Sequence, residues 1–209
     1  MTRDTVMEHL HPTFRHKVEL LLQDLAKAKL PFRVFEGFRT PQRQRDLYNQ
    51  GRSKPGAKVT NADAWSSLHQ YGVAADFVLY IDGKWSWDDK GERKAWWKKL
   101  HQLALQHQLE PLSWELPHLQ LQQIQLSQLR AGLYPPDGDA DWAENLQHAI
   151  ASWRGVPGAP PMLVKAHPVD RIAIGAERVD VAVALLAPVR ELDAQLERPL
   201  RGRHHLALV

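Results

Sequence analysis

Two stretches decide how this chain folds: Ser67-Leu68-His69-Gln70-Tyr71-Gly72-Val73-Ala74-Ala75-Asp76 and, later in the chain, Glu115-Leu116-Pro117-His118. Together they offer two imidazoles and a carboxylate as metal ligands, with a second carboxylate beside them. Two neutral imidazoles and one carboxylate fill three positions of a tetrahedral zinc ion and leave the fourth for water, whereas structural sites fill all four, usually with thiolates. The chain contains no cysteine. The ligand set is therefore that of a catalytic zinc site.

Glu115 supplies the proton-transfer group that such a site needs for hydrolysis. A water on the metal has its pKa lowered toward neutrality, and a nearby carboxylate that accepts and returns a proton completes a site for amide hydrolysis. The spacing of these residues alone is weak evidence for a site, since a chain with 24 acidic residues and 11 histidines places acids at such distances from histidines by chance. The small residues Gly72 and Ala74 add weight, because they let backbone approach closely, and the apolar run over residues 75–81 predicts a buried strand with Asp76 near its start.

These residues resemble the zinc peptidases of bacterial cell walls, through Ser67-x-His69-x-x-Gly72-x-Ala74-x-Asp76 and Glu115-x-x-His118. That group includes D-alanyl-D-alanine carboxypeptidases, vancomycin-resistance dipeptidases and the L-alanyl-D-glutamate endopeptidases of phage endolysins. Residues 36–52, which begin Glu36-Gly37-Phe38-Arg39-Thr40-Pro41, resemble the same group. Residues 54–62 resemble the endolysin branch in particular. The resemblance covers residues 8–125.

The resemblance implies roles for individual residues. It implies three metal ligands: His69, Asp76 and His118. It makes Glu115 the general base and acid, and Arg39 the cation that meets charge developing on the scissile carbonyl oxygen. Such a cation in a dry cleft is worth about 2.7–4 kcal/mol, by analogy with oxyanion-hole deletions. Two further polar residues are implied to orient the substrate: Gln44 and Ser67.

Three departures from the family pattern bear on substrate specificity more than on reaction class. Endolysin relatives often carry a Gly-Gly-x-Trp loop, and the equivalent stretch here, residues 109–115, reads as a shortened loop. Glu115 stands where those relatives often carry Asp, which lengthens the arm by one methylene. Leu119 stands where an aromatic residue is common.

We therefore expect a zinc metallopeptidase that hydrolyses the stem peptides of peptidoglycan, at the L-alanyl-D-glutamate bond as bacteriolytic endolysins of this type do. A D-alanyl-D-alanine carboxypeptidase with the same metal chemistry is the alternative, and a noncatalytic zinc-containing wall-binding module is a third. The presence of both Glu115 and Arg39 favours catalysis over the third.

Composition limits the remaining possibilities. A net charge of +3 and a pI near 9.2 favour approach to anionic polymers, but no dense basic run interleaved with aromatics predicts a nucleic-acid groove. No apolar signal segment and no run of membrane-spanning length is found, so neither a signal peptide nor membrane insertion is predicted. We expect synthesis in the cytoplasm and action on the wall after holin-type release. Host, wall chemotype, phage or bacterial origin and oligomeric state stay open.

Apolar periodicity and turn residues predict an α+β fold, in which a small antiparallel sheet carries the zinc site and helices flank it. The expected helices cover residues 12–29, 41–50 and 91–108, and the expected strands cover residues 32–35, 75–81, 84–87 and 114–121. The polar segment 52–67, which contains Pro55 and Gly56, is expected to form a loop bordering the cleft.

Three parts are expected along the chain: a catalytic domain over residues 1–133, a linker and helix over 134–161, and a small C-terminal extension over 162–209. A wall-binding, an oligomerising and a purely structural role compete for the extension. The remaining histidines are read as surface or capping residues. Of the eight tryptophans, Trp96, Trp97 and Trp142 fit core positions. Trp65 and Trp114 fall where they could meet substrate, and for these two a place lining the cleft and plain packing are both open.

Overall fold

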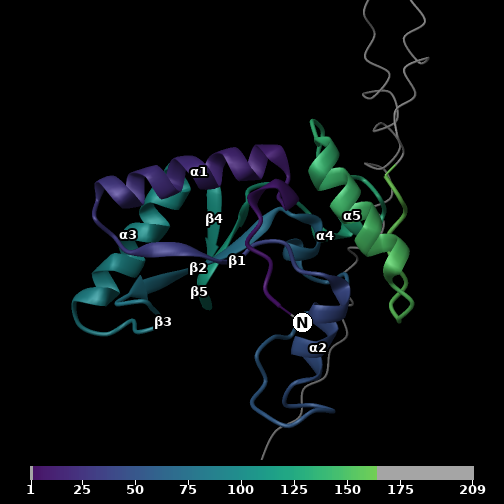
Figure 1. The fold of residues 1–209 in the computed structure, drawn as a ribbon, viewed down its shortest axis with the longest axis horizontal. Coiled ribbons are helices and arrows are strands. Elements are labelled where there is room, and N and C mark those ends of the chain that lie inside the picture. The colour runs from purple at the N-terminus through teal and green to yellow at the C-terminus, as the bar shows by residue number, and fades with distance from the viewer. Residues whose placement is uncertain (1, 164–209) are drawn as a thin grey trace, which may run out of the picture. The chain divides into compact units, whose positions relative to one another are not determined.

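A small antiparallel sheet lies at the centre of the computed structural model, which describes residues 2–163 (Figure 1). Within these residues the sheet has five strands: β1 (Phe32–Glu36), β2 (Ala74–Ile81), β3 (Lys84–Ser86), β4 (Leu109–Leu112) and β5 (Glu115–Leu121). The strand order is β1-β2-β5-β4, and β3 also pairs with β2. Strand β2 is buried along most of its length, as its apolar sequence predicts.

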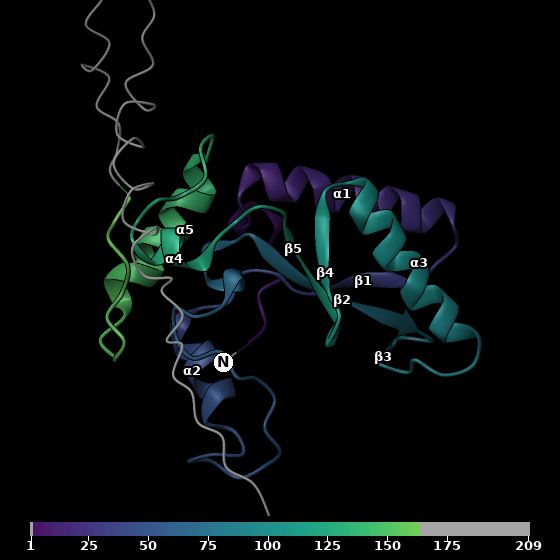
Figure 2. The ribbon, with the colours of Figure 1, turned by 180° about the vertical axis from the view of Figure 1, so that it is seen from behind.

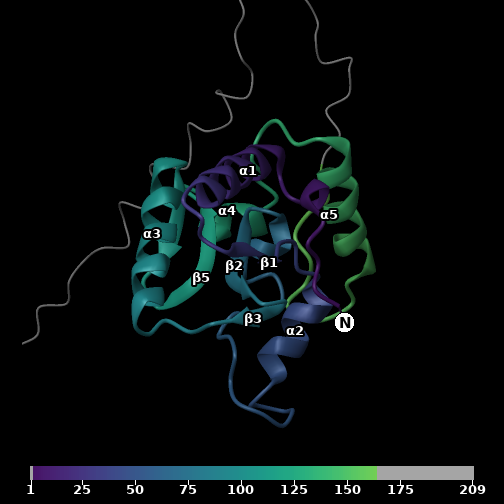
Figure 3. The same cartoon turned by 60° about the vertical axis from the view of Figure 1, so that its left-hand side comes forward.

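Helices flank this sheet, which confirms the predicted α+β fold. They are α1 (Pro12–Lys27), α2 (Pro41–Asn49), α3 (Glu92–Gln106), α4 (Leu126–Arg130) and α5 (Ala140–Ser152), together with the short 3-10 helices η1 (Met7–His9) and η2 (Leu68–Tyr71). Helices α1 and α3 contact each other, and α3 also packs on β4. Figure 2 shows the sheet and its helices from behind, and Figure 3 shows α3 and α5 on opposite sides of the strands.

Two helix starts follow the capping rules that the sequence suggests. The Thr40 hydroxyl accepts a hydrogen bond from the Arg43 backbone N–H at 3.2 Å, and Pro41 occupies the first turn of α2. At α1 the ring of His11 accepts from the Thr13 backbone N–H at 3.3 Å, again with a proline following the cap. The start of α2 matters most, because it fixes where the chain turns after Arg39.

Strand β4 was not predicted, since residues 109–115 were read as a shortened loop. These residues instead form an antiparallel hairpin with β5, closed by a pair between Leu112 and Glu115. Pro111 within the run argues against a strand in the sheet interior, but β4 pairs only with β5 and lies at the sheet edge, where a proline is tolerated. The two residues between the paired ends are Ser113 and Trp114.

Helix α5 belongs to the same hydrophobic core as the sheet, through Trp142, Leu146 and Ile150. The Trp142 indole N–H donates to the Tyr71 carbonyl at 2.9 Å. Gly72, with φ of 70°, leaves the space that this ring fills, because a Cβ there would lie 2.9 Å from the indole. Helix α5 therefore packs against η2 and is hydrogen-bonded to it.

The division of the chain into parts at residues 133 and 161 stays a prediction. The expected helix of the middle part is present as α5, and the extension lies outside the described residues from residue 164 onward. Trp97 and Trp142 are buried as expected, and Trp96 packs partly buried against the core. None of the helices described here has the length and apolar character needed to cross a bilayer.

Trp142→Ala should lower the free energy of unfolding by about 3–5 kcal/mol, because it empties a buried site of indole size. Trp142→Phe should cost about 1–3 kcal/mol, since the Tyr71 carbonyl loses its donor. Urea denaturation followed by circular dichroism measures both. The matched control is Trp114→Ala, at a side chain that is 79% exposed, and should change stability by less than about 0.5 kcal/mol. A Trp142→Ala protein as stable as this control would contradict the structural role of α5.

Candidate metal centre

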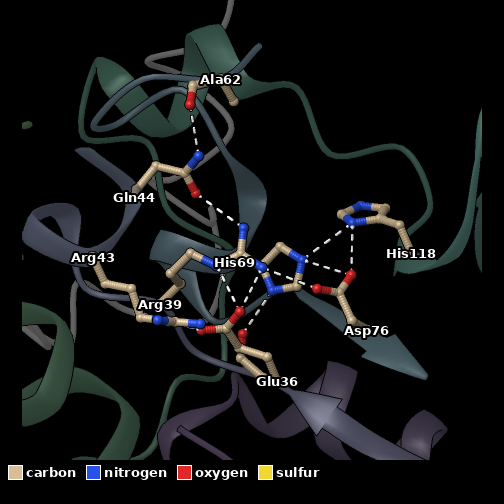
Figure 4. Close-up of polar contacts among 9 residues, drawn as sticks. Glu36, Arg39, Arg43, Gln44, Ala62, His69, Asp76 and His118 are labelled. Carbon is tan, nitrogen blue, oxygen red and sulfur yellow. Dashed lines mark hydrogen bonds and ion pairs between the residues drawn. The ribbon is translucent and has the colours of Figure 1, made fainter. Parts of the chain in front are cut away.

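Three predicted ligands converge in the structure, although they come from two strands and a 3-10 helix. Asp76 on β2 pairs directly with His118 on β5, and His69 lies on η2. One ligand atom from each lies within 4.8 Å of the other two (Figure 4). Asp76 Oδ1 is 3.3 Å from His69 Nε2 and 3.6 Å from His118 Nδ1. All three side chains are buried.

The outer nitrogens of both imidazoles are held by oxygen acceptors. His69 Nδ1 lies 2.7 Å from the Gly37 carbonyl, and His118 Nε2 lies 3.1 Å from Gln120 Oε1. We assign an N–H to each outer nitrogen on this basis, which leaves the inner nitrogens as lone-pair donors, the usual arrangement around metal-ligating histidines. Their partner Asp76 Oδ1 is buried and has no hydrogen bond within the described residues.

Three acceptor atoms that face one another without a donor between them are unfavourable unless a cation lies among them. His69 Nε2 and His118 Nδ1 are only 3.1 Å apart. The residues therefore fit a divalent cation held by two nitrogens and one oxygen, with the geometry left open on the side of the cavity.

The protonation states of His69 and Asp76 also favour a bound cation. Burial lowers the pKa of the His69 imidazole, and the Arg39 guanidinium lowers it further, so the neutral ring is favoured. Burial alone would raise the pKa of the Asp76 carboxyl. With the positive charge of Arg39 beside its other oxygen, that pKa is nonetheless held well below its usual range. Both groups are thus in their metal-binding forms at neutral pH.

Arg39 is held between two carboxylates. Its Nε and Nη2 donate to Glu36 Oε2 at 3.0 and 2.8 Å, and Nη2 also donates to Asp76 Oδ2 at 2.9 Å. Its Nη1 donates to Gln44 Oε1 at 3.0 Å. Of the five guanidinium N–H groups, four are used in these bonds. Arg39 also lines the cavity in front of the ligands, so it can both orient Asp76 and face a bound substrate.

Gln44 and Ser67 were both predicted to orient substrate, and the structure places them differently. Gln44 is fully buried, accepts from Arg39 and donates to the Ala62 carbonyl at 2.6 Å, and it is absent from the described residues that line the cavity. Ser67 does line the cavity, and it caps η2 in a reciprocal arrangement with Gln70. Gln44 is therefore positioned to hold Arg39 in place, whereas Ser67 lies at the wall of the cavity.

The cavity has a volume of about 450 Å³. Its walls include Arg39, His69, His118 and Glu115, and the residues around them are Val59, Thr60, Asn61, Ala62, Ser66, Ser67, Leu68, Leu112, Trp114, Gln120 and Leu126. Glu115 is exposed at the start of β5, three residues before His118. Of the two tryptophans left open between lining the cleft and plain packing, Trp114 lines the cavity. Trp65 is fully buried and packs near Tyr71.

Sequence reasoning missed the carboxylate behind the site. Glu36 is 2% exposed, ends β1, and is paired in the sheet with Asp76. Its second oxygen accepts from Arg43 Nε. The available sequence clue was an acidic residue at the end of a predicted strand, three positions before Arg39. Gln120, which accepts from His118, was missed as well, because an exposed-looking glutamine on a strand carries no comparable signal.

Comparison with known proteins finds several peptidases that this chain resembles. The L-alanyl-D-glutamate endopeptidase CwlK of Bacillus subtilis is 39% identical over 84 residues, which amount to 40% of this chain and 50% of that protein. The chain thus spans about half the length of this curated relative. The L-Ala D-Glu endopeptidase ChiX of Serratia marcescens is 23% identical with a TM-score of 0.40, covering 57% of this chain and 90% of ChiX.

The L,D-carboxypeptidase DacB from Streptococcus pneumonia is 20% identical with a TM-score of 0.44, covering 64% of this chain and 80% of DacB. A family model described as VanY, D-alanyl-D-alanine carboxypeptidase, matches residues 7–122. That match includes every residue that converges around the candidate metal centre. Because it also spans more than half of the 209 residues, the chain belongs to the VanY D-alanyl-D-alanine carboxypeptidase family.

Proposed function

We propose that this protein is a zinc-dependent peptidoglycan peptidase that hydrolyses the L-alanyl-D-glutamate bond of the stem peptide. The observation that carries the proposal is the convergence of His69, Asp76 and His118, two of which line the same cavity as Glu115. The identity shared with CwlK supports the choice of bond. Cleavage of a terminal D-alanine is the second candidate, favoured by the description of the family model.

Zinc is the metal proposed, since two imidazoles and one carboxylate form a common catalytic zinc set, and zinc lowers the pKa of a bound water and polarises a carbonyl. The residues of the chain supply the rest. Glu115 reaches the cavity from the first position of β5, where it can accept a proton from the attacking water and return it to the leaving amine. The arm of Glu115 and the ring of His118 share one strand, so their spacing is fixed by β5.

Arg39 has a double role in this proposal. Its two Nη2 hydrogens hold Glu36 and Asp76, so Asp76 keeps Oδ1 directed at the histidines. Arg39 also lines the cavity, where its positive charge can stabilise charge that develops on the scissile carbonyl oxygen. We propose Ser67 as a substrate contact and Gln44 as a brace for Arg39. Action on the cell wall in lysis, after holin-type release, completes the proposal.

Glu115→Gln should retain zinc and lose about 10²–10⁴-fold in turnover, because the amide cannot accept the proton. Mass spectrometry of muropeptides measures turnover, and elemental analysis measures bound metal. In the parent protein the products should separate the stem from lactyl-L-alanine, whereas loss of a terminal D-alanine would favour the second candidate. Glu92→Gln, at an exposed position in the first turn of α3, is the matched control and should behave as the parent. A Glu115→Gln protein as fast as the parent would exclude Glu115 as the base.

His118→Ala should abolish stoichiometric zinc binding, since one of three ligands is lost. Treatment of the parent with a chelator should likewise stop hydrolysis, and added zinc should restore it. Equilibrium dialysis and elemental analysis check the metal content, with His16→Ala on α1 as the control. Equal zinc content in the His118→Ala protein and in the control would refute the proposed ligand set.

Glu36→Gln should weaken zinc binding by about 10–100-fold, because Arg39 loses its buried counter-charge and Asp76 is no longer held firmly. Competition with a chromogenic chelator measures the affinity. The matched control is Asp24→Asn, which removes a carboxylate that pairs with Lys27 and His107 on another part of the surface. Unchanged zinc affinity in a folded Glu36→Gln protein would show that Glu36 does not position the ligand.

A further inference from the structure

Trp114 is unusually placed for so large an apolar side chain. It is 79% exposed, it occupies the turn between β4 and β5, and it directly precedes Glu115. Trp87, another exposed tryptophan, at 51%, packs its ring edge-on against Phe35 with centroids 4.9 Å apart. In the described part of the chain, no ring of another residue packs in this way on Trp114. An exposed indole at the edge of a catalytic cavity marks a place where a ligand is received.

The cavity offers this ligand two kinds of surface. Apolar side chains line it together with Trp114, namely Val59, Leu112 and Leu126, and Val59 is itself 50% exposed. Neutral polar side chains line it as well: Thr60, Asn61, Ser66 and Ser67. Among the described residues that line the cavity, Arg39 is the single lysine or arginine. Glu115 supplies the one carboxylate in the described part of this lining, and the other side chains named here suit a neutral group that is flat and partly apolar.

The chemistry of the proposed substrate narrows the choice. The stem peptide carries methyl groups, carboxylates and an amine, and none of these covers an indole face. The N-acetylmuramoyl sugar does, because the C–H face of a pyranose ring matches an aromatic ring in size and polarity. The hydroxyl and N-acetyl groups of the sugar can hydrogen-bond to neutral polar side chains such as Asn61 and Thr60 at the same time.

Distance along the substrate supports the same group. In cleavage of the L-alanyl-D-glutamate bond, one alanyl residue and the lactyl group separate the scissile carbonyl from the sugar, a span of about 7 Å at roughly 3.5 Å per residue. Trp114 is adjacent in sequence to Glu115, so a sugar at that distance can reach it. In cleavage of a terminal D-alanine the sugar would be several residues further away. The position of Trp114 therefore fits a bond next to the glycan.

We propose that Trp114 forms a subsite for the N-acetylmuramoyl sugar, so that the protein prefers sugar-linked stem peptides over free ones. This inference rests on the proposed function, since it assumes hydrolysis at the L-alanyl-D-glutamate bond. It assigns Trp114 to substrate selection and leaves proton transfer to Glu115.

The test compares kcat/KM for an N-acetylmuramoyl tetrapeptide with that for the same tetrapeptide N-acetylated in place of the sugar, using the zinc-loaded full chain. Trp114→Ala should lower the ratio of the two values by about tenfold, the equivalent of about 1.4 kcal/mol. Trp114→Phe should restore part of the ratio, and the control Trp87→Ala should leave it unchanged. A ratio near one in the parent, or an equal ratio in the parent and Trp114→Ala, would overturn the proposal.

Binding separates failure of this inference from failure of the proposed function. N-acetylmuramoyl-L-alanine is titrated calorimetrically into the zinc-loaded Glu115→Gln protein and into the same protein with Trp114→Ala. We expect about tenfold weaker binding in the second. If the parent cleaves neither peptide but this difference is found, the proposed function fails and the sugar subsite stands. If N-acetylmuramoyl-L-alanine binds both proteins equally, or binds neither of them, the subsite is refuted whatever the parent cleaves.

Discussion

The ion pair between Arg39 and Asp76 is the interaction on which the site depends. A carboxylate ligand has two oxygens, and the metal-binding one is directed correctly only if the other is fixed. Arg39 fixes Oδ2 at 2.9 Å and leaves Oδ1 among the imidazoles. The sheet register makes this possible, because Asp76 pairs with Glu36 on one side and with His118 on the other. Three neighbouring strands, β1, β2 and β5, thus place Glu36, Asp76 and His118 side by side.

Burying so many charges requires compensation, and the network provides it. Arg39 and Arg43 face Glu36 and Asp76, so the charges balance before any cation binds. Isolated buried carboxylates would be costly, and each here has at least one guanidinium partner. What is left uncompensated is the set of lone pairs on the cavity side of the ligands. The two guanidinium groups hold the carboxylates in place, and among the described residues no donor bonds to Asp76 Oδ1, the oxygen that faces the histidines.

Much of this arrangement could be predicted from the sequence, and the successes share a cause. His69, Asp76 and His118 stand in short patterns that fix their spacing, and local rules for proline, threonine and apolar periodicity give α1, α2 and β2. The failures involve contacts between distant segments. Pro111 hid an edge strand, and the burial of Gln44 depends on partners that lie outside its own helix. Nothing local in the chain shows that Glu36 stands behind Asp76, since that follows from strand pairing.

Helix α5 lies beyond residues 7–122, the part of the chain that matches the family. Its Trp142 indole nevertheless fills the space beside Gly72 and donates a hydrogen bond to the Tyr71 carbonyl. The 3-10 helix that carries His69 is consequently packed against a segment that lies outside the residues matching the family. Boundaries drawn by family similarity would cut through this packing. A transplant of the metal site into another protein would need to carry α5, or a substitute surface for Gly72, along with the ligands.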